Sequence, residues 1–250
     1  MLKFFATWMF RGRLAVLGCV FALVTHGAQA TPMFNLDYAT ESQLPSALGL
    51  TYTPLAPAQS ESSAFSVSGG ALHLDTITAP GDLMAYYQLT NGFDHTVDNT
   101  LSMKVKVTQM SDSFGLMVGV NDPTYQLYLN ITTSGWVVSG TGSSGTFTDP
   151  TAFHTFRLDT FAATHGFSLS IDGTPVASGL LTPGYAGETL VIFGDGSPTG
   201  GDLKADFQFI RFNAEPATVP EPSALMLSGI GVASLLVLRS IRNKRDGRAV

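Results

Sequence analysis

Cysteine and charged residues are scarce in this sequence. Only one cysteine, Cys19, occurs in 250 residues, and charged side chains make up 13% of the chain. A single thiol excludes a disulfide scaffold and any metal site built from several cysteines. The low charge, together with 44% hydrophobic residues, excludes an acidic disordered chain and a coiled coil. The composition therefore favours a folded, globular protein.

Lysine and arginine are missing over a long part of the chain. None occurs between residues 31 and 103, and residues 31–218 hold five basic against seventeen acidic residues, a net charge of −12. Residues 1–30 and 219–250 each carry a net charge of +3. A middle this acidic does not bind nucleic acid by neutralising phosphates, so we expect no nucleic-acid partner. Basic ends around an acidic middle are typical of an exported protein.

The sequence has no apolar run of the ~20 residues that a membrane-spanning helix usually needs. A shorter run, residues 14–24, follows the basic Arg13 and precedes small residues at Ala28 and Ala30. This order predicts a signal peptide over residues 1–30, cut by signal peptidase after Ala30, which leaves a mature chain without cysteine. A retained anchor is the alternative, disfavoured because eleven residues are too few.

A second apolar run lies near the C-terminus, over residues 224–238. It follows Pro220, Glu221 and Pro222 and is followed by a basic tail over residues 239–248. Fifteen helical residues rise only roughly 22 Å, short of the ~30 Å hydrocarbon core, so we expect a weakly held transmembrane helix. By the positive-inside rule the tail should stay cytoplasmic. The residues that would retain it are Arg239, Arg242, Lys244 and Arg245.

Residues 219–245 resemble the PEP-CTERM sorting signal of exported bacterial proteins, in the order of motif, apolar span and basic tail. The resemblance implies recognition near Pro220-Glu221-Pro222 by an exosortase-type membrane protease. The protein would be anchored transiently in the inner membrane and then relocated to the cell surface or the extracellular matrix. In that family the motif often accompanies exopolysaccharide production. It indicates a destination and leaves the task of residues 31–218 open.

Residues 31–218 read as one domain of β-strands without a convincing helix. Apolar residues alternate with polar ones, as in strands that are buried on one face. The expected strands include residues 101–107, 114–120, 127–131, 154–158, 167–171, 175–177, 189–193 and 205–212. Asp172-Gly173 predicts a type I′ hairpin turn. Ten to thirteen short strands predict an all-β, two-sheet antiparallel sandwich or jelly roll.

Two segments, residues 153–179 and 193–212, resemble laminin-G-like and concanavalin A-like sandwiches. The first contains an aromatic-His-x-aromatic-Arg strand, a strand ending in Asp-Gly and a return strand with Val-Ala-x-Gly. The second resembles the closing strands of those folds. The resemblance implies a fold that hosts lectins, adhesion modules, glycanases and inert spacers, so it implies no particular function.

The domain has no recognisable catalytic motif. Glycan hydrolysis normally uses two carboxylates beside the scissile bond, and no Glu-x-Asp-x-x-Glu strand of the laminarinase type occurs. A Gly-x-Ser-x-Gly elbow and a zinc-binding histidine spacing are also absent from the sequence. We therefore expect a protein that is not an enzyme. The alternatives are a secreted glycan-active hydrolase whose carboxylates meet only in space, and a structural spacer without a ligand.

Aromatic side chains are the candidates for sugar contact. Trp136 follows Ser134-Gly135 at an expected turn, where partial exposure would let its ring stack on a pyranose. Tyr128 lies on the polar face of its strand, opposite Leu127 and Leu129, and the further candidates are Tyr86, Tyr87 and Tyr125. The alternative is that these rings fill the core or close the rim of the sandwich.

Calcium is the one metal that the sequence favours, and no other cofactor is expected. Asp195 and Asp202 bracket a loop rich in glycine, serine and proline, and carboxylate oxygens are ligands that Ca²⁺ prefers. Ordinary turn chemistry explains the same residues equally well. The sequence thus predicts an exported surface or matrix protein that associates with polysaccharide.

Overall fold

The computed structural model describes residues 34–54, 59–78, 84–111, 113–185, 187–197 and 202–214. The predicted signal peptide and sorting segment lie outside these ranges. Their candidate residues are Ala28, Ala30, Pro220, Glu221, Pro222, Arg239, Arg242, Lys244 and Arg245. Within the described ranges, no helix has the length and apolar character needed to cross a membrane.

Nearly all regular structure is β-strand, as the alternating pattern predicts. The only described helices are the single turns η1 (Pro45–Leu48) and α1 (Glu61–Ala64). The strands are β1 (Phe34–Asp37), β2 (Thr51–Pro54), β3 (Phe65–Ser68), β4 (Ala71–Asp75), β5 (Ala85–Thr90), β6 (Asn99–Met110), β7 (Leu116–Asn121), β8 (Tyr125–Ile131), β9 (Gly135–Val138), β10 (Ser143–Thr146), β11 (His154–Phe161), β12 (Gly166–Ile171), β13 (Thr174–Leu180), β14 (Thr182–Pro183), β15 (Leu190–Asp195) and β16 (Leu203–Phe212).

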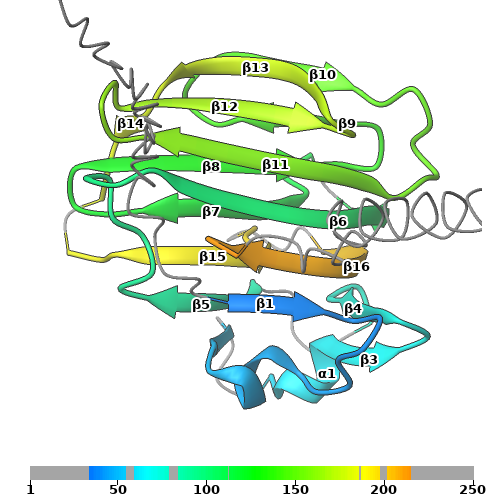
Figure 1. Ribbon diagram of the computed structural model, residues 1–250. Coiled ribbons are helices and arrows are strands. Elements are labelled where there is room, and N and C mark those ends of the chain that lie inside the picture. Colours follow the sequence, from blue (N-terminus) through cyan, green and yellow to red (C-terminus); the bar gives the residue numbers. More distant parts are fainter. Residues whose placement is uncertain are drawn as a thin grey trace, which may run out of the picture.

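The strands form two antiparallel sheets of eight strands each, which confirms the predicted sandwich (Figure 1). Sheet A has the order β13-β12-β11-β6-β16-β4-β3, with β1 also paired to β16. Sheet B has the order β10-β9-β8-β7-β15-β5-β2, with β14 also paired to β8. Sixteen strands exceed the predicted ten to thirteen, because several strands of two to four residues are too short to give an alternating pattern.

The core lies between the two sheets and is filled by the apolar half of each alternating strand. Along β6, Leu101, Met103 and Val105 are buried while the residues between them are partly exposed. Sheet B contributes Val118 and Leu129 to the same core. Successive side chains of a strand point to opposite faces, so each strand also has a row of side chains on the outer face of its sheet. These outer faces are the surfaces available for binding.

All five basic residues of the domain lie on the outward face of sheet A. They alternate with buried residues along β6, β11 and β16, the three adjacent central strands. They are Lys104, Lys106, Arg157, Lys204 and Arg211. Three of them form ion pairs with aspartates of the same face, at nitrogen–oxygen distances of 2.7–2.9 Å. The outward face of sheet B therefore lacks basic side chains.

Candidate functional site

A groove of about 690 Å³ lies on the outward face of sheet B. Its residues come from β5, β7, β8 and β15, and from the segments that border these strands. The lining residues are Met84, Tyr86, Phe114, Met117, Gln126, Tyr128, Asn130, Ser139, Gly140, Thr182, Tyr185, Leu190, Ile192 and Gly196. None of these fourteen residues carries a formal charge.

The floor of the groove depends on glycine at position 119. Gly119 on β7 pairs with Tyr128 on β8, and both point outward. A Cβ atom at position 119 would lie 2.4 Å from Cδ1 of Tyr128, so the ring covers the glycine and lies against the sheet. An aromatic ring over a cross-strand glycine shields the backbone from water. Tyr128 also lines the groove, so its ring is accessible from that side.

Three tyrosines share the groove. Tyr86 and Tyr128 are half-buried on the sheet, whereas Tyr185 is 65% exposed at the rim. Burial raises the pKa of Tyr128 to about 12, with a smaller contribution from the nearby Tyr185. Burial also raises the pKa of Tyr86, helped by the charge of Glu188. The hydroxyl groups of Tyr86 and Tyr128 therefore stay protonated near neutral pH and can both donate and accept hydrogen bonds.

Strand β8 also brings two amide side chains, Gln126 and Asn130, to the groove. Asn130 is held on both sides, because its Nδ2 donates to the Phe114 carbonyl at 3.1 Å and its Oδ1 accepts from the Ser139 hydroxyl at 3.0 Å. The Oε1 atom of Gln126 is buried and has no hydrogen-bond partner among the described residues. Gln126 thus holds an acceptor without a partner at a groove lined by aromatic, apolar and uncharged polar side chains.

The loop that carries Tyr185 is fixed to the sheet by a buried asparagine. The side chain of Asn121 accepts a hydrogen bond from the Tyr185 backbone N–H at 2.9 Å and donates one to the Glu188 carbonyl at 2.6 Å. Asn121 is 1% exposed, so the two bonds are shielded from water. These two hydrogen bonds hold the rim of the groove against the sheet.

Of the two predicted sugar-contact residues, the structure places only Tyr128 at the groove. The expectation that Trp136 is partly exposed is wrong, since its side chain is 6% exposed and belongs to the core. Trp136 lies opposite the buried Ile131 in the β8–β9 register, and paired residues point to the same face. The indole packs against Gly145 of β10, where a Cβ atom would come within 2.8 Å of the ring.

Of the further tyrosine candidates, only Tyr86 lines the groove, since Tyr87 is buried in the core, and the sequence reasoning missed Tyr185 and Met117. Tyr86 alternates with the buried Ala85 and Tyr87, so its outward position could have been read from β5 alone. Its place beside Tyr128 depends on β15 lying between β5 and β7, a strand order that alternation does not contain. Tyr185 follows β14, a strand of two residues that leaves no pattern at all.

The predicted calcium residues lie near each other around a buried threonine. The carboxylate of Asp195 is fully buried and accepts hydrogen bonds from the Thr76 hydroxyl at 2.6 Å and the Ser197 N–H at 3.0 Å. The Thr76 hydroxyl also accepts from the N–H of Leu203, the residue after Asp202. Over the part of the chain that the structure describes, no group of three histidine, cysteine, aspartate or glutamate side chains could hold a metal. Calcium binding stays a prediction.

The two packed sheets define the class of the domain, a two-sheet antiparallel β-sandwich, and comparison with solved structures agrees with this fold. A carbohydrate esterase from the Shiga toxin-encoding bacteriophage phi24B is similar at a TM-score of 0.50 and 13% identity, over 73% of this chain and 97% of that one. Peanut lectin is similar at a TM-score of 0.49 and 7% identity, over 73% of this chain and 97% of the lectin chain. A sialidase is similar at a TM-score of 0.48 and 14% identity, over 69% of this chain but only 18% of the sialidase chain. At these identities the likeness concerns the fold alone.

The chain also carries a sorting signal. A family model described as the PEP-CTERM protein-sorting motif matches residues 218–243, in agreement with the resemblance noted from the sequence. The motif implies export and sorting by an exosortase. A comparison with curated proteins found no match. The destination of the protein is thus better defined than the ligand of its sandwich.

Proposed function

We propose that the protein is a non-enzymatic cell-surface or extracellular-matrix protein whose sandwich binds an uncharged polysaccharide in the groove of sheet B. The observation that carries this proposal is the placement of Tyr128, whose ring packs over Gly119 and lines the groove. The C–H face of a pyranose ring is apolar and stacks on an aromatic ring, while its hydroxyl groups need polar partners. The tyrosine hydroxyls and Gln126 supply such partners beside the ring.

The hydrogen-bonding state of Gln126 adds to this argument. Its buried Oε1 has no partner among the described residues. A buried acceptor without a partner costs about 1–3 kcal/mol. Because Oε1 is buried, a sugar hydroxyl would reach it only when the Gln126 side chain turns toward the groove, and the hydrogen bond formed then would recover part of that cost.

The absence of charge in the groove supports the choice of an uncharged ligand. None of the lining residues is acidic or basic. A glycan-active hydrolase, the alternative function, normally requires two carboxylates about 5–10 Å apart at the scissile bond. Among the described residues, the one carboxylate whose charge affects the pKa of Tyr86 or Tyr128 is Glu188. Binding without hydrolysis therefore agrees better with these side chains.

Affinity electrophoresis of the full chain in gels containing dextran, laminarin or galactomannan tests the proposal, with alginate as an anionic comparator. At least one uncharged glycan should retard the protein, and Tyr128→Ala should weaken that binding about tenfold, equivalent to ~1.4 kcal/mol. Phe161→Ala is the matched control, because Phe161 is 40% exposed but lies on sheet A. The proposal fails if none of the three uncharged glycans retards the protein, or if Tyr128→Ala binds as well as the unmodified chain.

A further inference from the structure

One end of the sandwich carries three exposed apolar side chains that the groove does not use. We call them the exit-end patch: Val97, Phe161 and Leu180, with exposed fractions of 41%, 40% and 70%. Val97 lies in the connection between β5 and β6, Phe161 ends β11, and Leu180 ends β13. Exposed aromatic and aliphatic side chains that gather in one place mark an interaction surface more often than isolated ones do.

The three side chains belong to adjacent parts of sheet A. Phe161 and Leu180 both pair with Gly166 of β12, one from each side, and paired residues point to the same face. Gly166 has no side chain, so nothing on β12 separates the two. The loop of Val97 is tied to the same corner, because the Asp98 carboxylate accepts a hydrogen bond from the Ala162 N–H at 2.8 Å.

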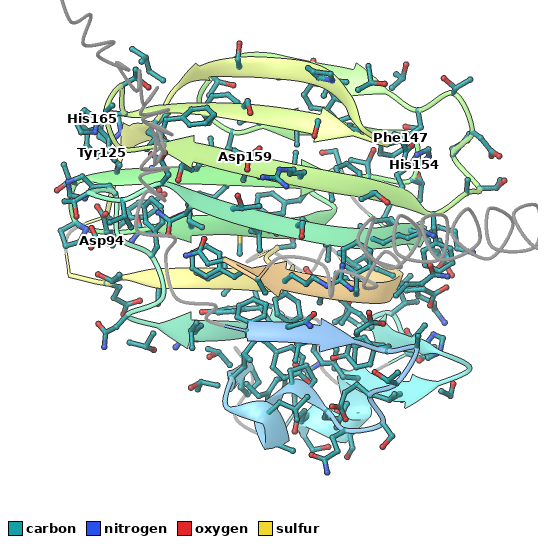
Figure 2. All side chains as sticks on the ribbon, in the orientation of Figure 1. Asp94, Tyr125, Phe147, His154, Asp159 and His165 are labelled. Atoms are coloured by element: carbon teal, nitrogen blue, oxygen red, sulfur yellow. The ribbon has the colours of Figure 1, made fainter. Side chains whose placement is uncertain are left out.

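The chain leaves the sandwich at this same end. β16 is antiparallel to β6, with Phe212 opposite Leu101, so its last residue lies where β6 begins. Asn213 fixes the exit: its Oδ1 accepts from the Thr100 N–H at 2.8 Å, and its own N–H donates to the Thr100 carbonyl at 2.8 Å. The ends of β11 and β13 in the left part of Figure 1 lie at this end, and Figure 2 places His165 and Asp94 there too.

Chain length keeps this end near the membrane during sorting. Pro220 follows the last described residue, Ala214, by six positions, and the apolar span begins at Ala224, ten positions on. Even a fully extended chain covers at most about 3.6 Å per residue, so Ala224 lies within roughly 36 Å of the exit. While residues 224–238 are held in a bilayer, the patch is therefore close to the membrane surface.

We infer that the exit-end patch docks on the bilayer interface while the sorting segment holds the protein, so that the groove of sheet B is carried beside the membrane until cleavage. Apolar and aromatic side chains enter the interfacial region of a bilayer to a depth of about 5–10 Å. The connections that bear the patch, residues 91–98 and 162–165, contain Asp94 and Asp98 and no lysine or arginine. The patch therefore suits zwitterionic lipid and is repelled by anionic lipid.

The inference rests on the sorting motif and is independent of glycan binding. It is tested with the full chain in phosphatidylcholine vesicles, in a Cys19→Ser background, with an environment-sensitive fluorophore attached at Leu180→Cys. The matched control is Val176→Cys on the same strand, 40% exposed but four residues farther from the exit end. Brominated lipid should quench the label at position 180 about threefold more than the label at position 176, because only the former contacts the interface. Quenching should fall when phosphatidylglycerol replaces phosphatidylcholine at low salt.

Three results would overturn the inference. The first is equal quenching at both positions in vesicles that the protein binds, as measured by flotation. The second is a blue shift in the emission of the label at position 180 when no vesicles are present. In that case a second copy of the protein, or residues 224–238 of the same chain, covers the patch. The third is failure of the full chain to float with the vesicles, because docking requires the anchored chain. None of these results bears on the glycan groove.

Discussion

At the scale of single residues, His154 is the clearest link between chemistry and stability. Its ring stacks on Phe147 with 4.5 Å between centroids, at the end of the sandwich opposite His165 (Figure 2). Nδ1 lies 2.7 Å from the Asp172 carboxylate and Nε2 lies 2.8 Å from the Asp149 carbonyl oxygen. Burial disfavours the charged ring, but the hydrogen bonds to Asp172 and Asp149 outweigh burial and raise the pKa of His154. Both nitrogens face acceptors, which suits the doubly protonated ring.

This arrangement predicts a pH-dependent contribution to stability. Because the pKa of His154 is higher in the folded state, the contribution is complete below the unfolded pKa of about 6.5 and is lost as pH rises through the folded value. His154→Asn should lower the free energy of unfolding by about 1 kcal/mol at pH 5.5, less than the roughly 1.5–3 kcal/mol of a buried charged hydrogen bond because Asp172 is half exposed. The difference should shrink by pH 8.5, as measured by urea denaturation.

The partner residue supplies the control for that measurement. Asp172→Asn keeps a side chain that tolerates the positive φ of 51° at this position but removes the charge. It should flatten the pH dependence between pH 5.5 and 8.5 in the same way. If the difference in unfolding free energy between His154→Asn and the unmodified chain stays constant from pH 5.5 to 8.5, protonation of His154 does not stabilise the fold.

Gly119 carries a second prediction at this scale. In Gly119→Ala the new methyl group would lie 2.4 Å from the Tyr128 ring and 2.5 Å from the Leu127 carbonyl oxygen, so ring and backbone must shift. We expect a loss of about 1–3 kcal/mol in unfolding free energy, as for other overpacked sites, together with weaker glycan binding. Tyr128→Phe keeps the ring over Gly119 and should retain most of the stability. Unchanged stability and unchanged binding in Gly119→Ala would show that the ring does not form the groove floor.

At the scale of elements, the β12–β13 hairpin shows how much a short motif can determine. Asp172 and Gly173 have φ values of 51° and 78°, as the predicted type I′ turn requires. The returning strand is longer than predicted, 174–180 instead of 175–177, because pairing with β12 extends it beyond its apolar residues. Turn chemistry is local and could be predicted, whereas strand length depends on the partner.

The turn itself can be tested. Gly173→Ala meets no atom within 4 Å, so its cost comes from the backbone conformation alone. We expect a loss of about 1–2 kcal/mol in unfolding free energy by denaturant titration, the usual penalty for a non-glycine residue in the left-handed region. Ser178→Ala, an exposed change on the same strand, should have little effect. Equal stability of the two variants would argue against the turn type.

The same elements explain what the sequence could not predict. Alternation identified β6, β8 and β12 because each buries one face against the core. β10 reads Ser-Ser-Gly-Thr and has no apolar residue to alternate, yet it pairs with β9 and covers Trp136. The wrong expectation that Trp136 is exposed and the failure to identify Tyr185 have the same cause. Which face a residue occupies depends on the partner strand, and a single strand of four residues or fewer does not specify its partner.

At the scale of the whole molecule, the two outward faces differ in charge. Sheet A carries all five basic side chains of the domain, largely paired with aspartates, and the groove of sheet B is uncharged. Binding of dextran, laminarin or galactomannan through the groove should therefore change less than about twofold between roughly 50 and 500 mM NaCl, since salt screens only charged contacts. A steep loss of affinity with salt would indicate that sheet A holds the ligand instead.

The most direct test of the account is where a glycan binds. Methionine methyl groups labelled with carbon-13 distinguish the groove from the core, because Met84 and Met117 line the groove whereas Met103 is buried in the core and Met110 packs against it. During titration of the full chain with the uncharged glycan that binds it, the Met84 and Met117 signals should shift while those of Met103 and Met110 stay in place. Binding that leaves Met84 and Met117 unchanged would contradict the assignment of the groove.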